Sequence, residues 1–410
     1  MKKSLLILAC AASVFTLGAQ QSVVKEAEKA MKAGKTYNEV LSIMKPAMTD
    51  TETAEDVAVY YIPGKAAFNQ YDKMLGLRQL KQLKSPEDTI QMGILLLNGF
   101  ENFQKALPLD SKPDAKGKVK QKYTKDIYNV LAGHLNDLTV EGANLYNLGK
   151  YKDAYDLWMK FVEVESNPES IGLKPELVQP DDVVANFIQN AGLAAYQDKD
   201  YNLAAETFVK AAEKGYDKES FFHNGLSIAI QANNPEAIYY FASKGNAKYG
   251  HTDPFYINNL INYYLQNEKY DEALKYLDNA IVEDPENAQY FVLEGMIWDE
   301  RGDLDKATDL YAQALKIEPE NGLANFQYGS SLYRQADKKD NEFQGSPSKY
   351  DAFKQSEIIP LYLEAIKYME NAYKYDEYNK SKALTILEVL YYNTNNEEGM
   401  NSVKERKLAD

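Results

Sequence analysis

The feature that most constrains the fold of this chain is a repeat of 34 residues. Two consecutive segments align from Pro254 onward, PFYINNLINYYLQNEKYDEALKYLDNAIVEDPEN and AQYFVLEGMIWDERGDLDKATDLYAQALKIEPEN. Matched residues that lie 34 positions apart are Ala273 and Ala307, Ala280 and Ala314, and Pro285 and Pro319. Such a period indicates that one structural unit is stacked along an axis, so the 410 residues need no single large core.

Each unit has the pattern of two antiparallel helices that are joined by a short turn. A small residue on the first helix, Gly295, and an alanine on the second, Ala307, allow the two helices to approach closely. Residues 301–304 form the turn, and Pro319 ends the second helix because proline cannot continue it. The physical character of each position therefore predicts a helix pair.

This spacing resembles that of the tetratricopeptide repeat (TPR) family, whose 34-residue unit is a helix, a turn and a second helix. The resemblance covers roughly Leu135 to Asp376, where weaker units have matching residues at Gly142, Ala154 and Trp158, at Gly192, Ala204 and Phe208, and at Gly225, Ala237 and Phe241. It implies an all-α fold, an α-α superhelix in which antiparallel helix pairs form a TPR solenoid. It also implies a scaffold that binds other proteins and is not an enzyme.

The first residues indicate export from a bacterial cytoplasm. Met1 to Lys3 is a basic start, and Ser4 to Leu17 is an apolar run without a charge, which together are typical of a secretory signal peptide over residues 1–19 with cleavage after Ala19. We expect a periplasmic or secreted chain with no membrane segment after cleavage. The only cysteine, Cys10, lies in this signal, and we interpret it as an apolar signal residue instead of a lipid attachment site.

Composition divides the remaining chain into segments. The expected segments are a divergent helical region over 20–107, a basic linker over 108–125, the solenoid over 126–378 with a polar irregular insertion over 338–357, and a capping helix pair over 379–410. In the first segment, breaks are expected at Gly34-Lys35, at 49–53, at Pro63-Gly64 and at Ser85-Pro86.

The basic linker is interpreted as a solvated loop, with a polyanion site as the alternative. The insertion is either inert or a flap that contacts a partner.

Charge and motifs argue against several classes of function. The formal net charge of −15 disfavours binding to nucleic acid and to anionic membranes. Three histidines, His134, His223 and His251, have no metal-ligand spacing, and serine elbows, phosphate-binding loops and zinc-protease helices are missing from the sequence. We therefore expect no catalytic residue, no metal and no cofactor.

The register of the family places a peptide-binding groove on the first helices of successive units. The groove residues that this implies are Phe222, Leu226, Asn258, Asn262, Gln266, Met296, Asp299, Phe326, Ser330, Tyr333 and Arg334. The amides of Asn258 and Asn262 could hold an extended peptide backbone, or they could simply face water. The lysines of the family's carboxylate clamp have no counterpart, and only Arg334 is cationic, so we expect a protein or peptide partner but not an acidic C-terminal tail.

The 32 tyrosines allow a second interpretation. Doublets recur at 60–61, 239–240, 263–264 and 391–392. Most of these tyrosines are expected to interlock in the core between helices. The alternative is that exposed tyrosines form a platform for glycans or peptidoglycan fragments.

Overall fold

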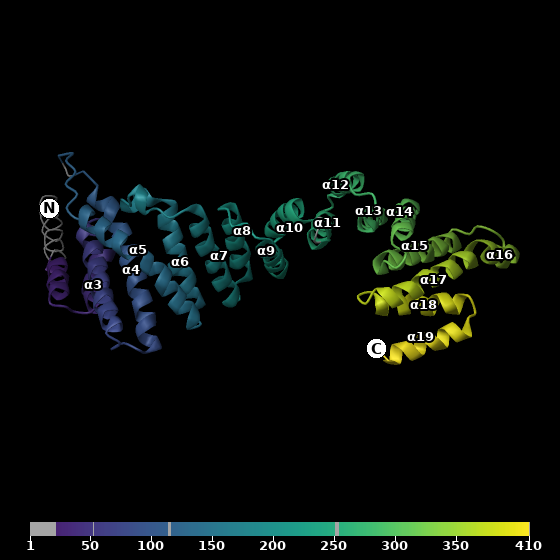
Figure 1. Ribbon diagram of the computed structural model, residues 1–410, viewed down its shortest axis with the longest axis horizontal. Helices are drawn as coiled ribbons and strands as arrows, with labels where there is room; N and C mark the ends of the chain where they lie inside the picture. Colours follow the sequence, from purple (N-terminus) through teal and green to yellow (C-terminus); the bar gives the residue numbers. More distant parts are fainter. Residues whose placement is uncertain (1–21, 52, 114–115, 251–253, 410) are drawn as a thin grey trace, which may run out of the picture. The chain divides into compact units, whose positions relative to one another are not determined.

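A computed structural model describes residues 22–51, 53–113, 116–250 and 254–409. The regular elements in these ranges are helices that stack as antiparallel pairs, so the predicted all-α solenoid fold is confirmed (Figure 1). None of these helices has both the length and the apolar character needed to cross a membrane. The predicted signal peptide, Cys10 and His251 lie outside the described residues.

The chain divides into two compact units, which we call unit 1 (Met1–Tyr249) and unit 2 (Gly250–Asp410). The division falls inside the expected solenoid segment 126–378, and the basic linker 108–125 lies within unit 1. After a helix over residues 22–32, the elements of unit 1 are α2 (Tyr37–Thr49), α3 (Val57–Gln79), α4 (Pro86–Asp110), α5 (Thr124–Asn147), α6 (Tyr151–Ser166), the 3₁₀ turns η1 (Pro168–Ile171) and η2 (Pro175–Leu177), α7 (Asp181–Gln197), α8 (Tyr201–Glu213), α9 (Glu219–Gln231) and α10 (Pro235–Tyr249).

Unit 2 continues the same alternation of first and second helices. Its elements are α11 (Pro254–Gln266), α12 (Tyr270–Glu283), α13 (Ala288–Glu300), α14 (Leu304–Ile317), α15 (Gly322–Asn341), α16 (Pro347–Phe353), the π-helical turn η3 (Lys354–Ile358), α17 (Ile359–Tyr375), α18 (Lys380–Asn393) and α19 (Glu397–Ala409). Helices α11, α13, α15 and α18 are the first helices of their pairs, and each packs against the second helix that follows it.

Glycines on first helices face large side chains on second helices. A Cβ atom at Gly225 of α9 would lie 2.6 Å from the ring of Phe241 on α10. The same arrangement pairs Gly142 with Trp158, Gly192 with Phe208 and Gly295 with Tyr311. Because only a residue without a side chain permits this approach, the role that the sequence assigns to these small residues is confirmed.

The expected break at Pro63-Gly64 is wrong, because α3 runs through both residues. Gly64 instead lies against the ring of Phe103 on α4, so this glycine serves helix packing and not a turn. The expected start at Ser85 is confirmed. Ser85 Oγ accepts a hydrogen bond from the backbone N–H of Asp88 at 3.1 Å, and both halves of a capping box are present.

The loop between α4 and α5 is shorter than the expected linker 108–125, because α4 runs to Asp110 and α5 begins at Thr124. Asp110, the last residue of α4, is buried, and its carboxylate accepts hydrogen bonds from the backbone N–H groups of Lys122, Tyr123 and Thr124 at 3.0, 2.7 and 2.7 Å. These donors lie at the start of α5, where a negative charge also favours the helix dipole. The loop is therefore anchored at its end by the helix that precedes it.

The insertion 338–357 is largely helical, so the expectation of an irregular stretch is wrong. It lengthens α15 to Asn341 and then forms α16 and η3. Phe343 stacks on Phe353 with ring centroids 4.5 Å apart, and Ile358 at the end of η3 is fully buried. Apolar residues that the polar composition concealed therefore fold the insertion back onto its own unit.

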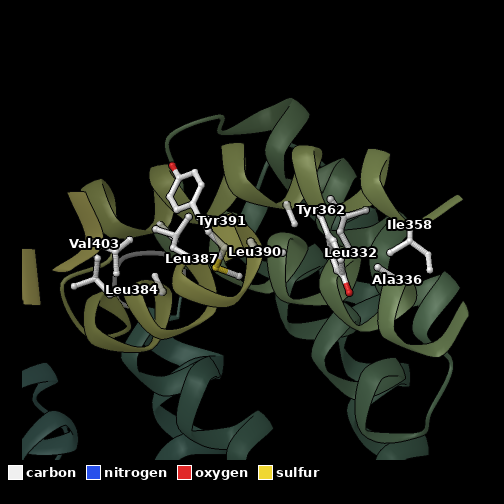
Figure 2. Close-up of a cluster of buried hydrophobic side chains, with 13 residues drawn as sticks. Leu332, Ala336, Ile358, Tyr362, Leu384, Leu387, Leu390, Tyr391 and Val403 are labelled. Carbon is white, nitrogen blue, oxygen red and sulfur yellow. The ribbon is translucent and has the colours of Figure 1, made fainter. Parts of the chain in front are cut away.

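The C-terminal pair α18 and α19 agrees with the expected capping helices and their break near residues 393–396. Figure 2 shows its core, where α15, α17, α18 and α19 contribute Leu332, Tyr362, Leu384, Leu387 and Val403. Arg406 is not a purely solvent-facing residue. Its guanidinium donates two hydrogen bonds of 2.8 Å to the carboxylate of Glu370 on α17, which attaches the last helix to the preceding pair.

Candidate binding face of unit 2

Three first helices of unit 2 carry most of the predicted groove residues. Helix α11 contacts α13, and α13 contacts α15. Spacings of three and four residues place the predicted positions of each helix on one side of it. We call this surface the first-helix face, and it comprises Asn258, Asn262 and Gln266 of α11, Met296 and Asp299 of α13, and Phe326, Ser330, Tyr333 and Arg334 of α15.

The α11 side of this face presents amides. Asn262 and Gln266 are exposed and lie one helical turn apart. Asn258 is half-buried, and its Oδ1 accepts a hydrogen bond of 2.8 Å from Nε2 of Gln289 on α13. This bond positions α11 against α13 and leaves the two exposed amides as hydrogen-bonding groups for a ligand.

A bidentate ion pair joins α13 and α15. Arg334 Nη1 and Nη2 donate hydrogen bonds to Asp299 Oδ1 and Oδ2 at 2.7 and 2.5 Å. The side chain of Asp299 is 17% exposed and that of Arg334 is 44% exposed. The cation that the sequence offered for ligand binding is thus neutralised by another predicted groove residue, and a ligand carboxylate must compete with Asp299 for it.

The apolar members of the face belong partly to the core. Met296 is half-buried and packs against two buried clusters of unit 2, and Phe326 packs against the cluster of Figure 2. Tyr333 lies 6.1 Å from the ring of Tyr362 on α17. Only part of each side chain therefore remains for contact with a ligand.

Two buried hydroxyls belong to the same region of unit 2. Within the described residues, Tyr311 Oη on α14 and Ser330 Oγ on α15 have no hydrogen-bond partner. Burial raises the pKa of Tyr311, and the negative charge of Asp299 raises it further. No sequence pattern marks Tyr311 as a polar group here, because its position in the repeat is that of a core aromatic residue.

Phe222 and Leu226 are not surface residues, and their assignment to the groove is wrong. They are 4% and 0% exposed, and they lie on α9 in unit 1. The ring of Phe222 packs edge-on against that of Phe241 on α10 at 5.8 Å. On a first helix, core and groove positions lie only about one turn apart, so the repeat register did not separate them. The aromatic side chain of Phe222 suited either position.

His134 occupies a structural position between two helices of unit 1. Its Nδ1 lies 2.9 Å from Asp137 on α5, and its Nε2 lies 3.4 Å from Asp72 on α3. His223 is exposed on α9. Across the described ranges, no group of three or more histidine, cysteine, aspartate or glutamate side chains is arranged to hold a metal ion.

The most exposed tyrosines are dispersed. Tyr378 is 87% exposed, Tyr392 is 70% exposed, and Tyr239 of unit 1 is 42% exposed. Tyr378 and Tyr392 flank the two ends of α18, which places them roughly 20 Å apart along its axis. This distribution does not favour the platform of adjacent tyrosines that a glycan site would need.

Stacked helix pairs with a surface built from their first helices define an all-α helical repeat protein. Residues 258–322, which span most of α11 and all of α12, α13 and α14, match the tetratricopeptide repeat family model. Unit 2 therefore contains tetratricopeptide repeats.

Several solved structures are similar in fold. YrrB, described as a TPR protein with an unusual peptide-binding site, is 18% identical, with 50% of this chain and 95% of YrrB covered and a TM-score of 0.30. PilF of Pseudomonas aeruginosa is 14% identical, with 56% and 92% covered and a TM-score of 0.37. A TPR repeats protein of Bacteroides fragilis is 15% identical, with 63% and 98% covered and a TM-score of 0.33. No curated protein sequence matches the chain. At these values the similarities carry no argument about function.

Proposed function

We propose that this chain is a non-catalytic scaffold of the bacterial cell envelope that binds a protein or peptide on the first-helix face of unit 2. The observation that carries the proposal is the combination of exposed amides on α11 with half-buried apolar side chains on α13 and α15. Amides can bond to an extended peptide backbone, and the apolar side chains can contact alternate peptide side chains. The envelope location rests on the signal-like residues 1–19.

The Asp299–Arg334 ion pair bears on which peptides would bind. An acidic group of a ligand must displace Asp299, whereas a neutral peptide can leave the pair intact. We therefore propose a partner segment that is extended and largely uncharged where it crosses α13 and α15.

Site-directed photocrosslinking tests this function directly. A photoreactive residue at Gln266, on the first-helix face, is compared with one at Gln313, which is exposed on the second helix α14. In envelope extracts, Gln266 should crosslink a specific protein, and Asn262→Ala should reduce the yield of that product. Equal products from the two sites, or a yield that Asn262→Ala leaves unchanged, would contradict the assignment of the face.

A further inference from the structure

A second candidate site is a cleft in unit 1 with a volume of about 380 Å³. It lies between the turn that joins helix 22–32 to α2 and the last turns of α3. Its volume falls in the range of roughly 300–1,000 Å³ that is usual for ligand sites. Neither the repeat register nor the first-helix face includes it.

The cleft exists because α3 is longer than α2. Helix α3 has 23 residues and α2 has 13. The backbone N–H of Tyr37, at the start of α2, donates a 2.7 Å hydrogen bond to Gln70 Oε1, so the part of α3 after Gln70 extends beyond α2. On α3, the residues that line the cleft form a stripe along one side of the helix, at spacings of three and four residues from Ala66 through Lys73 to Leu77. Ala66 lies at the edge of the buried cluster that holds α2 and α3 together.

This stripe presents hydrogen-bond donors above an apolar floor. Gln70 Oε1 is occupied by the Tyr37 N–H, so the amide NH₂ group of Gln70 is left as a donor. Lys73 is exposed, and over the described part of the chain it makes no ion pair or hydrogen bond. Met74 and Leu77 are half-buried beside it and supply apolar surface.

Two further lysines stand at the rim, and among the residues that the structure describes no carboxylate lines the cleft. Lys32 pairs with Glu28 at 2.6 Å, and Lys35 pairs with Glu39 at 2.9 Å. All four of these side chains are at least 45% exposed, so each pair contributes little to stability, and a carboxylate of a ligand can compete for the lysine. Two of the three lysines are thus paired, and Lys73 is the cation that makes the cleft complementary to an anion in a chain with a net charge of −15.

We propose that this cleft binds an acidic peptide segment of a partner protein. A carboxylate of the segment pairs with Lys73 and accepts from the amide of Gln70, and the neighbouring apolar side chains of the segment cover Met74 and Leu77. An inorganic anion would use the lysines but leave the apolar floor uncovered, which is why the chemistry favours a peptide that combines acidic and apolar side chains.

Isothermal titration calorimetry of the full chain tests the proposal. The probe is the capped peptide Leu-Glu-Glu-Leu-Leu, and the matched uncharged probe is Leu-Gln-Gln-Leu-Leu. The acidic peptide should bind more tightly than the uncharged one, and its affinity should fall as salt is added. Lys73→Gln should weaken binding about 5-fold, the upper range for a partly exposed pair, and Lys73→Glu should weaken it further.

The control variant is Lys105→Gln, which removes an exposed helical lysine on α4 outside the cleft and should leave the affinity unchanged. Asn262→Ala should also have no effect, so failure of the first-helix face and failure of this cleft can be told apart. Circular dichroism checks that each variant folds, and if Lys73→Glu does not, Lys73→Gln decides the result.

Three outcomes would overturn the proposal. The first is no heat at about 1 mM acidic peptide. The second is equal affinity of the wild type and Lys73→Gln. The third is displacement of the peptide by inorganic phosphate at equal concentration, which would identify the cleft as a site for a bare anion.

Discussion

Substitution of Gly225 by alanine tests the packing rule on which the whole fold depends. The added Cβ atom would lie 2.6 Å from Cε1 and Cζ of Phe241 and 2.9 Å from its Cδ1. Carbon atoms pack at about 3.5–4.0 Å, so α9 and α10 must separate by roughly 1 Å or the ring must leave its rotamer. Phe241 is fully buried, and close packing in protein interiors leaves such a ring little room to move.

The expected magnitude combines two opposing effects. Overpacking in a buried site costs about 1–3 kcal/mol. Alanine is about 1 kcal/mol more favourable than glycine in a helix interior. Since three ring atoms are approached at once, we expect Gly225→Ala to lower the free energy of unfolding of unit 1 by about 1–2 kcal/mol.

Urea denaturation followed by circular dichroism measures the change, with Gly133→Ala as the control. Gly133 is an exposed residue of α5 in the same unit, and a Cβ atom there would meet nothing within 4 Å. Its replacement should raise the free energy of unfolding by about 0.5–1 kcal/mol. In a Phe241→Leu background, Gly225→Ala should become less costly, because the ring edge is gone. Equal stabilisation by both alanine substitutions would refute the argument.

Three further outcomes follow from charged groups. Arg78→Met leaves the fully buried Glu141 carboxylate without its guanidinium and should cost about 3 kcal/mol in urea denaturation, while the added change Glu141→Leu should recover much of the loss. Burial raises the pKa of Glu294, so this carboxyl group binds its proton more tightly in the folded state than in the unfolded state. Its contribution to the free energy of unfolding should fall as pH rises above about 4.3, and the difference between wild type and Glu294→Gln across that pH range measures it. Asp299→Asn should change stability by less than about 1 kcal/mol, because Arg334 is partly exposed, but calorimetry should show tighter binding of acidic peptides to the first-helix face.

The fold was predictable because its signals are local. Gly225 and Phe241, or Gly295 and Tyr311, are 16 residues apart, and one repeat contains both members of each pair. The start of α4 at Ser85 was equally readable, since a capping box occupies only four residues. The error at Pro63-Gly64 came from a residue pair that usually marks a turn, whereas here the glycine accommodates a neighbouring helix.

The candidate site was only partly predictable, because exposure and pairing depend on neighbouring repeats. The register placed Asp299 and Arg334 on first helices, but they are 35 residues apart, and nothing in the sequence stated that each neutralises the other. Likewise, no local pattern distinguished the buried Phe222 from the half-buried Phe326. The polar composition of 338–357 hid the aromatic residues that fold this insertion.

By itself, the sequence determined that the chain consists of stacked helix pairs, because the alternation of small and large residues recurs within each 34-residue unit. Tertiary structure decided which of those side chains face solvent, which cations remain available and where the chain divides into two units. The physical reason is that helix pairing depends on residues within one repeat, whereas burial and ion pairing depend on side chains that separate repeats bring together.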